Sequence, residues 1–257
     1  MIDDGRTVNW SKASVDYGNY RPGPPDSFYE KLLALDIGKK GQHILDLGTG
    51  TGVLARRFAG QGAVVAGVDI AQGQIEVAMQ LAEQEKLSID FRISAAEHTP
   101  FSDQSFDAIT ANQCWLYFDF NKAVNEVKRL LKKEGILVIS SFLWLPAQSE
   151  IVQASEKLIL KYNPQWSDHS WDGNLQAEPA WVTEKFTLRH WLCYDEQIPF
   201  TRAEWRGRIR ANRGIGATLT KEEVKKFEQE HDLLLQKIAG DKFKIPHRIF
   251  ARVLMPK

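Results

Sequence analysis

An acidic residue followed by three alternating glycines constrains the fold of this chain more than any other feature. Residues 44–53 read Ile-Leu-Asp-Leu-Gly-Thr-Gly-Thr-Gly-Val, so Asp46 lies near the end of an apolar run and Gly48, Gly50 and Gly52 follow it. The apolar run is typical of a buried parallel strand, and the glycines predict the tight turn that leads into the next helix. Glycine lets the backbone bend sharply and lets a ligand approach where a Cβ atom would collide. The motif therefore predicts a ligand-binding turn, or else a glycine-rich turn with no ligand.

The acid and the glycine spacing distinguish between nucleotide ligands. Asp46 places a negative charge beside the turn, where it would repel the pyrophosphate of a dinucleotide. A dinucleotide site also needs Gly-x-Gly-x-x-Gly, and counting from Gly48 the last glycine of that pattern falls on Val53. A phosphate-binding P-loop needs Gly-Lys-Ser/Thr after the turn, where residues 53–55 read Val-Leu-Ala. The motif therefore favours a cationic or neutral cofactor.

Strands and helices alternate along the first half of the chain. Apolar or alternating runs predict strands at residues 44–47, 63–69, 89–93, 106–111 and 136–139. Helical spacing of apolar residues predicts helices at residues 53–59, 74–86 and 123–131. We expect Gly135 to stop the last of these helices. Strands that alternate with helices imply a parallel sheet with right-handed crossovers.

The second half of the chain has a different character. Residues 146–183 are rich in tryptophan and show little periodicity, apart from a helical pattern at residues 150–162. Further on, the patterns predict strands at residues 186–200 and 247–254 and helices at residues 202–210 and 221–238.

The turn at Asp46 resembles the first signature of class I S-adenosylmethionine-dependent methyltransferases, because the acid, the glycine spacing and the preceding strand all agree. The resemblance implies an α/β fold with a doubly wound, seven-stranded, mostly parallel sheet of the Rossmann-like type, and an aromatic-rich insertion as substrate cover. Residues 186–200 and 247–254 would be the sixth strand and the antiparallel seventh. The resemblance extends over about residues 15–145 and through the last strand. Within the family, the likeness is to the type-11 small-molecule group, which includes trans-aconitate methyltransferase-like proteins.

The same resemblance implies the cofactor, the reaction and the domain plan. S-adenosyl-L-methionine would donate a methyl group to a small-molecule acceptor by in-line displacement, leaving S-adenosyl-L-homocysteine. The chain is expected to form one domain over residues 1–257. Its segments would be an N-terminal helical cover at 1–40, a cofactor-binding core at 41–145, the substrate-cover insertion at 146–185, and the last helices and strands at 186–257.

The predicted site lies at the carboxyl ends of the strands, where open parallel sheets bind ligands. Asp69 ends a predicted strand, and in the resembled family the acid at this position accepts hydrogen bonds from both ribose hydroxyls. Residues 94–101 resemble the segment beside the adenine, with Ala96 where many relatives have an acid, and residues 112–119 resemble the segment at the methionine end. The cofactor-binding residues predicted in this way are Tyr20, Arg21, Asp46, Gly48, Thr49, Gly50, Gly52, Asp69, Ile70, Gln74, Ala95, Ala96, Glu97, Asn112, Gln113 and Trp115.

An upstream segment completes the resemblance. Residues 17–25 are similar to the Tyr-x-x-x-Arg-Pro segment of many small-molecule methyltransferases, in which an aromatic residue and an arginine fold over the cofactor. The planar fork of Arg21 suits a carboxylate, so the resemblance implies that Arg21 binds the carboxylate of the cofactor. The alternative is a proline-fixed linker that leads to a helix from Asp26.

The chemistry of methyl transfer asks little of the protein beyond positioning. A carboxylate or an unprotonated amine needs no base, whereas a phenol or an alcohol would benefit from one. Tyr117 is the first candidate at the methyl-transfer face, followed by His169 and His190. Cys114 has no base near it in the sequence, so we expect a small buried residue rather than a nucleophile.

Two side-chain groups in the second half have alternative interpretations. One group is aromatic and would form an apolar pocket, a cation–π cage or ordinary core. Its members are Trp144, Trp166, Trp171, Trp181 and Tyr162. Arg202, Arg206, Arg208, Arg210 and Arg213 form an arginine group, in which all but Arg208 share a helix face that would receive an anionic substrate or be solvated.

Composition limits the partners and the compartment. Lysine plus arginine equals aspartate plus glutamate at 33 each, so no net charge attracts nucleic acid or an anionic membrane. The two cysteines lie far apart, which argues against a disulfide framework or a zinc site and fits a reducing cytoplasm. The polar N-terminus is not a signal peptide, and residues 136–145 are too short to span a bilayer. We therefore expect a cytoplasmic protein with no metal, nucleic-acid or membrane partner.

Two other functions remain open beside a methyltransferase. A non-catalytic protein that binds S-adenosylmethionine or S-adenosylhomocysteine would keep the same cofactor features without a base. A nicotinamide-dependent dehydrogenase would use a similar sheet, but the acid before the turn and the glycine spacing disfavour it. No pattern in the sequence identifies the methyl acceptor.

Overall fold

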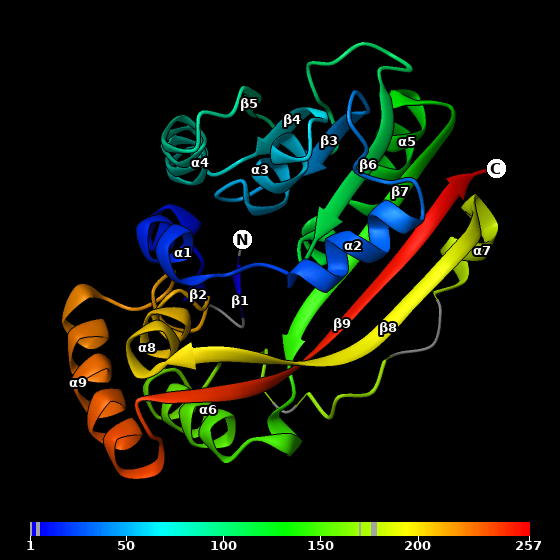
Figure 1. The fold of residues 1–257 in the computed structure, drawn as a ribbon. Coiled ribbons are helices and arrows are strands. Elements are labelled where there is room, and N and C mark those ends of the chain that lie inside the picture. Colours follow the sequence, from blue (N-terminus) through cyan, green and yellow to red (C-terminus); the bar gives the residue numbers. More distant parts are fainter. Residues whose placement is uncertain (1, 4–5, 170, 176–178) are drawn as a thin grey trace. The chain divides into compact units, whose positions relative to one another are not determined.

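The chain divides into two compact units in the computed structural model, which describes residues 2–3, 6–169, 171–175 and 179–257 (Figure 1). We call the unit that holds the central strands of the sheet the sheet unit and the other the helical unit. The sheet unit comprises Gly23–Phe142, Gln176–Tyr194 and Ile249–Lys257, and the helical unit comprises Met1–Pro22, Leu143–Leu175 and Asp195–Arg248. The boundaries between these two units differ from the boundaries of the four predicted segments, which are 1–40, 41–145, 146–185 and 186–257. That all 257 residues form one domain stays a prediction.

The predicted seven-stranded sheet is confirmed. Its strands are β3 (His43–Leu47), β4 (Val64–Asp69), β5 (Ile89–Ile93), β6 (Phe106–Asn112), β7 (Leu131–Trp144), β8 (Phe186–Thr201) and β9 (Lys242–Pro256), in the order β5-β4-β3-β6-β7-β9-β8. β3 pairs in parallel with β4 and β6, and the outer pairs β4–β5 and β6–β7 are parallel as well. Figure 1 shows β9, the red arrow, running against β7 and β8. The sheet is therefore mixed and mostly parallel, as expected.

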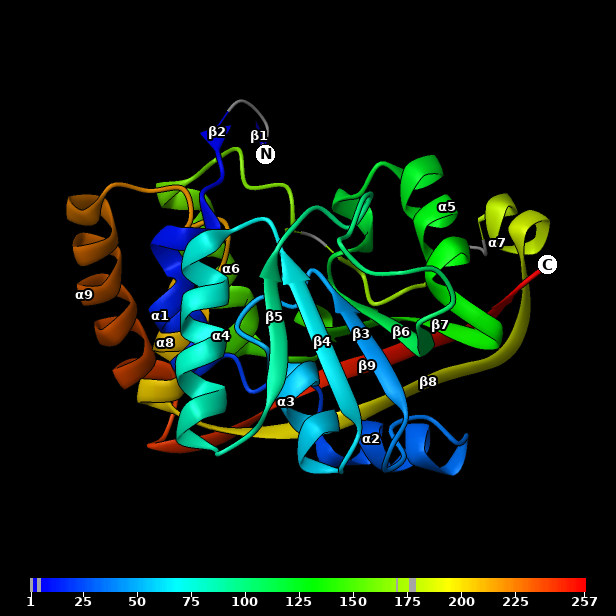
Figure 2. The same cartoon turned by 90° about the horizontal axis from the view of Figure 1, so that it is seen from above.

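The helices of the sheet unit follow from the connections between strands. They are α2 (Asp26–Ala34), α3 (Val53–Gly60), α4 (Gln72–Gln84), α5 (Phe120–Leu130) and α7 (Ala180–Lys185), with a short 3₁₀ turn η2 (Trp115–Tyr117). From β3 the chain moves towards one edge of the sheet through β4 and β5, and it later moves towards the other edge through β6 and β7. Because both sets of connections are right-handed, their helices lie on opposite faces of the sheet. Figure 2 shows α3 on one face and α5 on the other.

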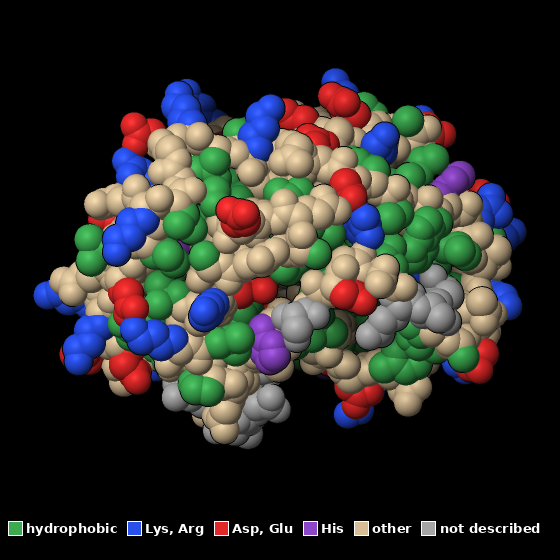
Figure 3. Space-filling view, turned by 90° about the horizontal axis from the view of Figure 1, so that it is seen from below, with side chains coloured by type: hydrophobic (Ala, Val, Ile, Leu, Met, Phe, Trp, Pro, Cys, Tyr) green, Lys and Arg blue, Asp and Glu red, His purple; other side chains and the backbone are tan. Residues whose placement is uncertain are grey.

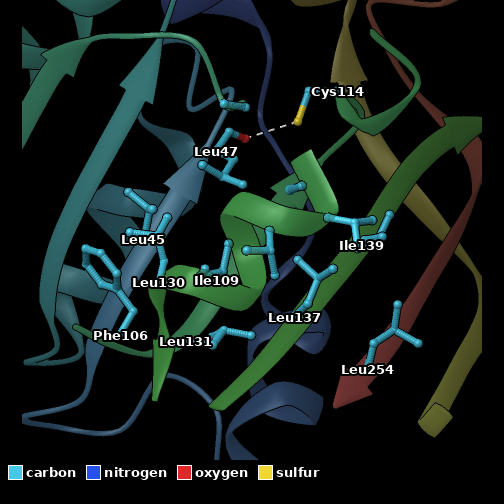
Figure 4. Packing of buried hydrophobic residues seen from close by; sticks show 14 of the residues in the cluster. Leu45, Leu47, Phe106, Ile109, Cys114, Leu130, Leu131, Leu137, Ile139 and Leu254 are labelled. Carbon is cyan, nitrogen blue, oxygen red and sulfur yellow. Dashed lines mark hydrogen bonds between the residues drawn. The ribbon is translucent and has the colours of Figure 1, made fainter. Parts of the chain in front are cut away.

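The core of the sheet unit lies between β3, β6, β7 and α5. Figure 4 shows the aliphatic side chains of these elements packed together, including Leu45, Ile109, Leu130 and Leu137, which are all fully buried. On α5 the buried residues recur at helical spacing, as the sequence predicted for residues 123–131.

One predicted helix end is wrong. α5 ends at Leu130, and Leu131 already has the extended backbone (φ −72°, ψ 137°) with which β7 begins. The strand pairs through Leu131 with Phe106 and through Ile136 with Ala108, so residues 132–135 bulge out between the two pairs. Gly135 therefore lies in a bulge and does not stop the helix.

The helical unit surrounds its own buried aromatic residues. Its elements are β1 (Ile2–Asp3), β2 (Arg6–Thr7), η1 (Trp10–Ala13), α1 (Ser14–Tyr20), η3 (Pro146–Gln148), α6 (Glu150–Tyr162), α8 (Arg202–Arg210) and α9 (Lys221–Ile238). α8 and α9 each begin at a threonine with a complete capping box, which satisfies backbone N–H groups at the helix start. Trp166 and Trp205 are fully buried here.

Candidate functional site

The glycine turn joins β3 to α3 at the carboxyl end of the central strand. Gly48, Gly50 and Gly52 all have positive φ angles, of 60°, 56° and 76°, which only glycine adopts easily. Two of them are also packed closely: a Cβ atom would lie 2.8 Å from Cys114 Cβ at Gly48, and 2.8 Å from Phe91 Cζ at Gly52. The turn therefore requires glycine for its backbone and for its packing.

Asp46 holds this turn from inside the sheet. Its buried carboxylate accepts hydrogen bonds from Thr49 Oγ1 and Thr110 Oγ1, both at 2.7 Å, so it connects β3 to the turn and to β6. Burial raises the pKa of Asp46 to about 6, against the two threonine hydrogen bonds, and the charge of Asp69 raises it further. Thr110 was not among the predicted site residues, although it is a polar residue in an apolar strand.

Asp69 lies at the end of β4 and accepts backbone hydrogen bonds from both sides. Gly50 N donates to its Oδ2 at 3.0 Å, and Ala71 N donates to its Oδ1 at 2.9 Å. Burial raises the pKa of Asp69, and the backbone hydrogen bonds lower it. A carboxylate has about four lone-pair positions, so each oxygen can accept a further hydrogen bond. The side chain of Ile70 next to it is 72% exposed.

The segment after β5 lies against the end of β4. Ser94 N donates to Asp69 O at 3.1 Å, which brings this segment beside Asp69. Ala95 is exposed and Ala96 is buried. Half-buried Glu97 accepts a hydrogen bond from Asp119 N at 2.7 Å, so its carboxylate connects this segment to the segment that follows β6.

The segment after β6 is fixed to β7 by side-chain hydrogen bonds. Gln113 has a left-handed backbone (φ 58°), and its Nε2 donates to Phe142 O at 2.8 Å. Asn112 Oδ1 accepts from Ser140 Oγ at 3.0 Å. Trp115 is half-buried and stacks on Trp181 with 5.8 Å between ring centroids. These residues therefore occupy fixed positions at the sheet edge.

Cys114 and Tyr117 lie in the same segment. Cys114 is buried and donates a hydrogen bond from Sγ to Leu47 O at 3.1 Å, the dashed line in Figure 4. Burial raises its pKa well above the usual value, with smaller contributions from Asp46 and Asp69. Cys114 is thus a packed residue, as predicted, and not a reactive thiolate. Tyr117 is half-buried in η2.

The structure thus brings most of the predicted residues together at the carboxyl ends of neighbouring strands. We call this set the strand-end cluster: Asp46, Gly48, Thr49, Gly50, Gly52, Asp69, Ile70, Ala95, Ala96, Glu97, Asn112, Gln113 and Trp115. Gln74 is buried in the first turn of α4, one element beyond Asp69.

Tyr20, Arg21 and His169 belong to the helical unit. The ring of Tyr20 packs against α8, where a Cβ atom on Gly207 would lie 2.1 Å from Tyr20 Cγ. The Arg21 guanidinium lies over the ring of Tyr17, 4.3 Å from its centroid. His169 is exposed. The importance of Gly207 could be suspected only from a glycine inside an otherwise helical pattern.

The predicted arginine face is largely occupied by ion pairs within the helical unit. Arg206 pairs with Glu228 and Asp232, Arg210 with Asp16 and Glu228, Arg213 with Asp168, and Arg202 with Asp241. Neither expectation, a solvated face or an anion-binding face, included these ion pairs, and Arg213 lies beyond the end of α8 at Arg210. Their acidic partners lie far away in the sequence. Arg208 differs and is only 4% exposed.

The aromatic residues of the predicted insertion do not form one group. Trp144 and Trp166 are buried in the helical unit, and Tyr162 and Trp171 are half-buried there. Trp181 is half-buried in the sheet unit, where it stacks on Trp115. Residues 170 and 176–178 of this insertion lie outside the described residues.

The described residues, which leave out 1, 4–5, 170 and 176–178, contain no group of three His, Cys, Asp or Glu side chains placed to hold a metal ion. Over the same part of the chain, no helix has the length and apolar character needed to cross a membrane. Side chains of both charges are mixed over the face in Figure 3.

Comparison with protein families matches residues 38–231 to a family model described as a methyltransferase domain. A ubiquinone biosynthesis O-methyltransferase from Coxiella burnetii is 34% identical over 112 residues, which are 43% of this chain and 48% of that protein. The enzyme of the same name from Dinoroseobacter shibae is 33% identical over 133 residues, 51% of this chain and 53% of its own. The chain thus spans about half the length of these curated relatives.

Solved structures show the same fold. Phosphoethanolamine N-methyltransferase 2 from Haemonchus contortus, in complex with S-adenosyl-L-methionine, superposes with a TM-score of 0.54 and 23% identity, covering 100% of this chain and 58% of that one. YjhP from E. coli gives a TM-score of 0.56 at 18% identity, covering 96% and 99%. The likeness to the type-11 group, and the role of each predicted cofactor contact, stay predictions.

Proposed function

The chain belongs to the methyltransferase domain family, and on that premise we propose that it transfers a methyl group from S-adenosyl-L-methionine to a small-molecule acceptor. The observation that carries the proposal is the position of Asp69. Its carboxylate is fixed by the backbone of the glycine turn on one side and of the next loop on the other, and both oxygens retain accepting capacity. Such an acid suits a pair of hydroxyl groups, as on a ribose.

The other residues of the strand-end cluster fit the rest of the cofactor. The exposed side chain of Ile70, with Ala95, offers apolar surface to a flat ring. The turn from Gly48 to Gly52 offers backbone without side chains. Trp115 and Gln113 would line the methionine end. In this arrangement Asp46 does not contact the cofactor directly and instead positions the glycine turn that does.

The chain's own contribution to methyl transfer is to position the cofactor and the acceptor. When bound, S-adenosylmethionine supplies a methyl group on a positively charged sulfur, which needs little further activation. Within the described part of the strand-end cluster, the carboxylates of Asp46, Asp69 and Glu97 all accept hydrogen bonds from the protein itself. This favours an acceptor whose nucleophilic atom is ionised or unprotonated before transfer, held in line with the methyl group. Tyr117 is the proposed residue at the methyl-transfer face.

Substitution of Asp69 tests the assignment of the ribose contact. Asp69→Ala should weaken the binding of S-adenosylhomocysteine by roughly 1 to 3 kcal/mol, because charge-assisted hydrogen bonds of this kind are lost. Asp69→Asn is the matched control for size and should lose less. Unchanged affinity in Asp69→Ala, measured by isothermal titration calorimetry, would place the ribose contact elsewhere.

A non-catalytic binding protein is the second candidate, because the carboxylates of the strand-end cluster are all engaged in structural hydrogen bonds. A methyl-transfer screen over carboxylates, phenols and amines separates the two functions. Turnover of any acceptor, lost in Asp69→Ala, supports the enzyme. Consistent silence with tight cofactor binding supports the binding protein.

A further inference from the structure

The loop between β5 and β6, residues 94–105, is attached to α5 at both ends of that helix. Asp119 is the N-cap residue of α5, and its backbone N donates to Glu97 at 2.7 Å. At the other end of the helix, Gln104 N donates to Arg129 O at 2.9 Å. The loop and the helix both belong to the sheet unit. The position of the loop therefore depends on α5.

Glu126 of α5 makes the central contact with this loop. Its Oε1 atom accepts hydrogen bonds from Thr99 N at 2.7 Å and from Thr99 Oγ1 at 2.8 Å. Both residues are buried, since Glu126 is 6% exposed and Thr99 is 3% exposed. A buried carboxylate is unfavourable unless hydrogen bonds replace its hydration. Here two of those bonds come from the loop, so the acid fixes both the backbone and the side chain of Thr99.

Arg129 balances the charge of Glu126 and adds a second contact with the loop. Its Nη2 donates to Glu126 Oε1 at 2.7 Å and its Nε donates to Glu126 Oε2 at 2.8 Å, which is the paired geometry of a strong ion pair. Its Nη1 donates to Phe101 O at 2.7 Å. Burial raises the pKa of Glu126, but the hydrogen bonds from Arg129 and Thr99 lower it, and the net shift is downward. Glu126 therefore stays ionised at neutral pH.

The contacts of α5 reach the part of the loop that the proposed function places beside the adenine. The helix itself is held in the core of the sheet unit by buried Val124, Val127 and Leu130. Thr99 lies three residues beyond Ala96. The side chain of Ala96 has no polar atom, so at that position only backbone groups can form a hydrogen bond with the ring. A hydrogen bond weakens steeply when its geometry is wrong, so the position of this backbone matters.

A backbone that recognises a ligand needs a second layer of residues to hold it. We propose that Glu126 and Arg129 are positioning residues, which hold the backbone of residues 95–99 where it contacts the adenine ring of the cofactor. Both act through Thr99 and Phe101, without contacting the cofactor. This inference rests on the proposed function and adds to it two residues of the helix behind the site.

Amide hydrogen exchange of the ligand-free full chain tests the positioning. In Glu126→Ala, residues 94–101 should exchange about tenfold faster than in the wild type, because Thr99 N loses its acceptor. Glu126→Gln keeps an oxygen that accepts from Thr99 N, so it should show an intermediate rate. Thr99→Val removes only the hydroxyl contact and should show a smaller change in the same direction. This variant keeps the test available should Glu126→Ala not fold.

Asp107→Asn is the matched control. Asp107 also accepts a hydrogen bond from a backbone amide, His43 N at 2.8 Å, and also pairs with a cation, Lys132. It lies near the start of β6, at the opposite end of the strands from the strand-end cluster. Its substitution should therefore leave the exchange of residues 94–101 unchanged.

Calorimetry tests the link between this positioning and the cofactor. S-adenosylhomocysteine should bind Glu126→Ala about tenfold more weakly than the wild type, and it should bind Asp107→Asn like the wild type. S-inosylhomocysteine has an oxygen where adenine has its amino group, and a fixed backbone distinguishes the two. The preference of the wild type for S-adenosylhomocysteine over S-inosylhomocysteine should therefore shrink in Glu126→Ala. A general loosening of the site would lower both affinities alike.

The two experiments separate the possible failures. Unchanged exchange of residues 94–101 in Glu126→Ala would overturn the positioning. Faster exchange with an unchanged affinity for S-adenosylhomocysteine, or with an unchanged preference between the two ligands, would overturn the link to the adenine alone. A wild type that does not bind S-adenosylhomocysteine would contradict the proposed function, and this inference with it, whatever the exchange rates are.

Discussion

At the scale of single residues, the site depends on two acids that the fold keeps partly or fully out of water. Asp46 is buried and stabilised by two threonine hydroxyls, and Asp69 is fixed by two backbone amides. Each acid loses hydration and is compensated by hydrogen bonds whose donors belong to the turn or to a neighbouring strand. The turn is therefore held at defined geometry before any ligand binds.

Asp46→Asn should change how stability depends on pH. The pKa of Asp46 is raised from 3.8 to about 6 in the folded state, so between these values the folded chain binds more protons than the unfolded chain. The contribution of the wild-type acid is therefore present below about pH 4 and lost as the pH rises through 6. From pH 4 to pH 7 the free energy of unfolding of the wild type should fall relative to Asp46→Asn by about 3 kcal/mol. The free energies of unfolding are measured by urea denaturation at each pH. A difference between the two proteins that stays constant from pH 4 to pH 7 would contradict this pKa.

At the scale of elements, contacts between distant helices determine which residues are tolerated. α1 packs on α8 through the Tyr20 ring and Gly207, and Ser155 of α6 accepts a hydrogen bond from Trp205 Nε1 of α8 at 3.0 Å. The same Ser155 hydroxyl lies 3.0 Å from His231 Nε2 of α9. Such contacts join α1, α6, α8 and α9 within the helical unit, and they are sensitive to small changes.

Gly207→Ala should destabilise the protein although alanine is the better helix former. The helical preference gains about 1 kcal/mol, but the new Cβ atom would meet the Tyr20 ring at 2.1 Å, and overpacking of this kind costs about 1 to 3 kcal/mol. Gly60→Ala in α3 is the matched control, because its Cβ atom would meet nothing within 4 Å. It should be neutral or stabilising. Thermal denaturation compares them, and equal effects of the two substitutions would argue against the close contact.

His231 should make the helical unit sensitive to acid. Burial lowers its pKa from 6.5 to about 4; the charge of Arg206 lowers it further and that of Asp232 raises it. Between these values the unfolded chain binds more protons, so stability is present above pH 6.5 and is lost as the pH falls towards 4. The wild type should lose about 3 kcal/mol in this window relative to His231→Gln. A variant with the same acid sensitivity as the wild type would exclude His231 as the cause.

At the scale of the whole molecule, the sequence predicts features that depend on local patterns better than it predicts contacts between residues far apart in the chain. The glycine turn and helices α3, α4, α5, α6, α8 and α9 follow from periodicity and from a single motif, because these depend on neighbours within a few residues. The bounds of α1 and α7 were not predicted. The bond from Thr110 to Asp46 and the ion pairs of Arg206 join residues far apart in the sequence, and no local pattern encodes them. The bulge at Gly135 was missed for a related reason, since it depends on the pairing of β7 with β6.

For the whole molecule, we propose that the strand-end cluster binds S-adenosylmethionine and not a dinucleotide. Titration calorimetry of S-adenosylhomocysteine and of NAD into the full chain tests it directly. We expect binding of S-adenosylhomocysteine and no detectable binding of NAD, because Asp46 and the glycine spacing disfavour a pyrophosphate at the turn. Binding of NAD without binding of S-adenosylhomocysteine would contradict it.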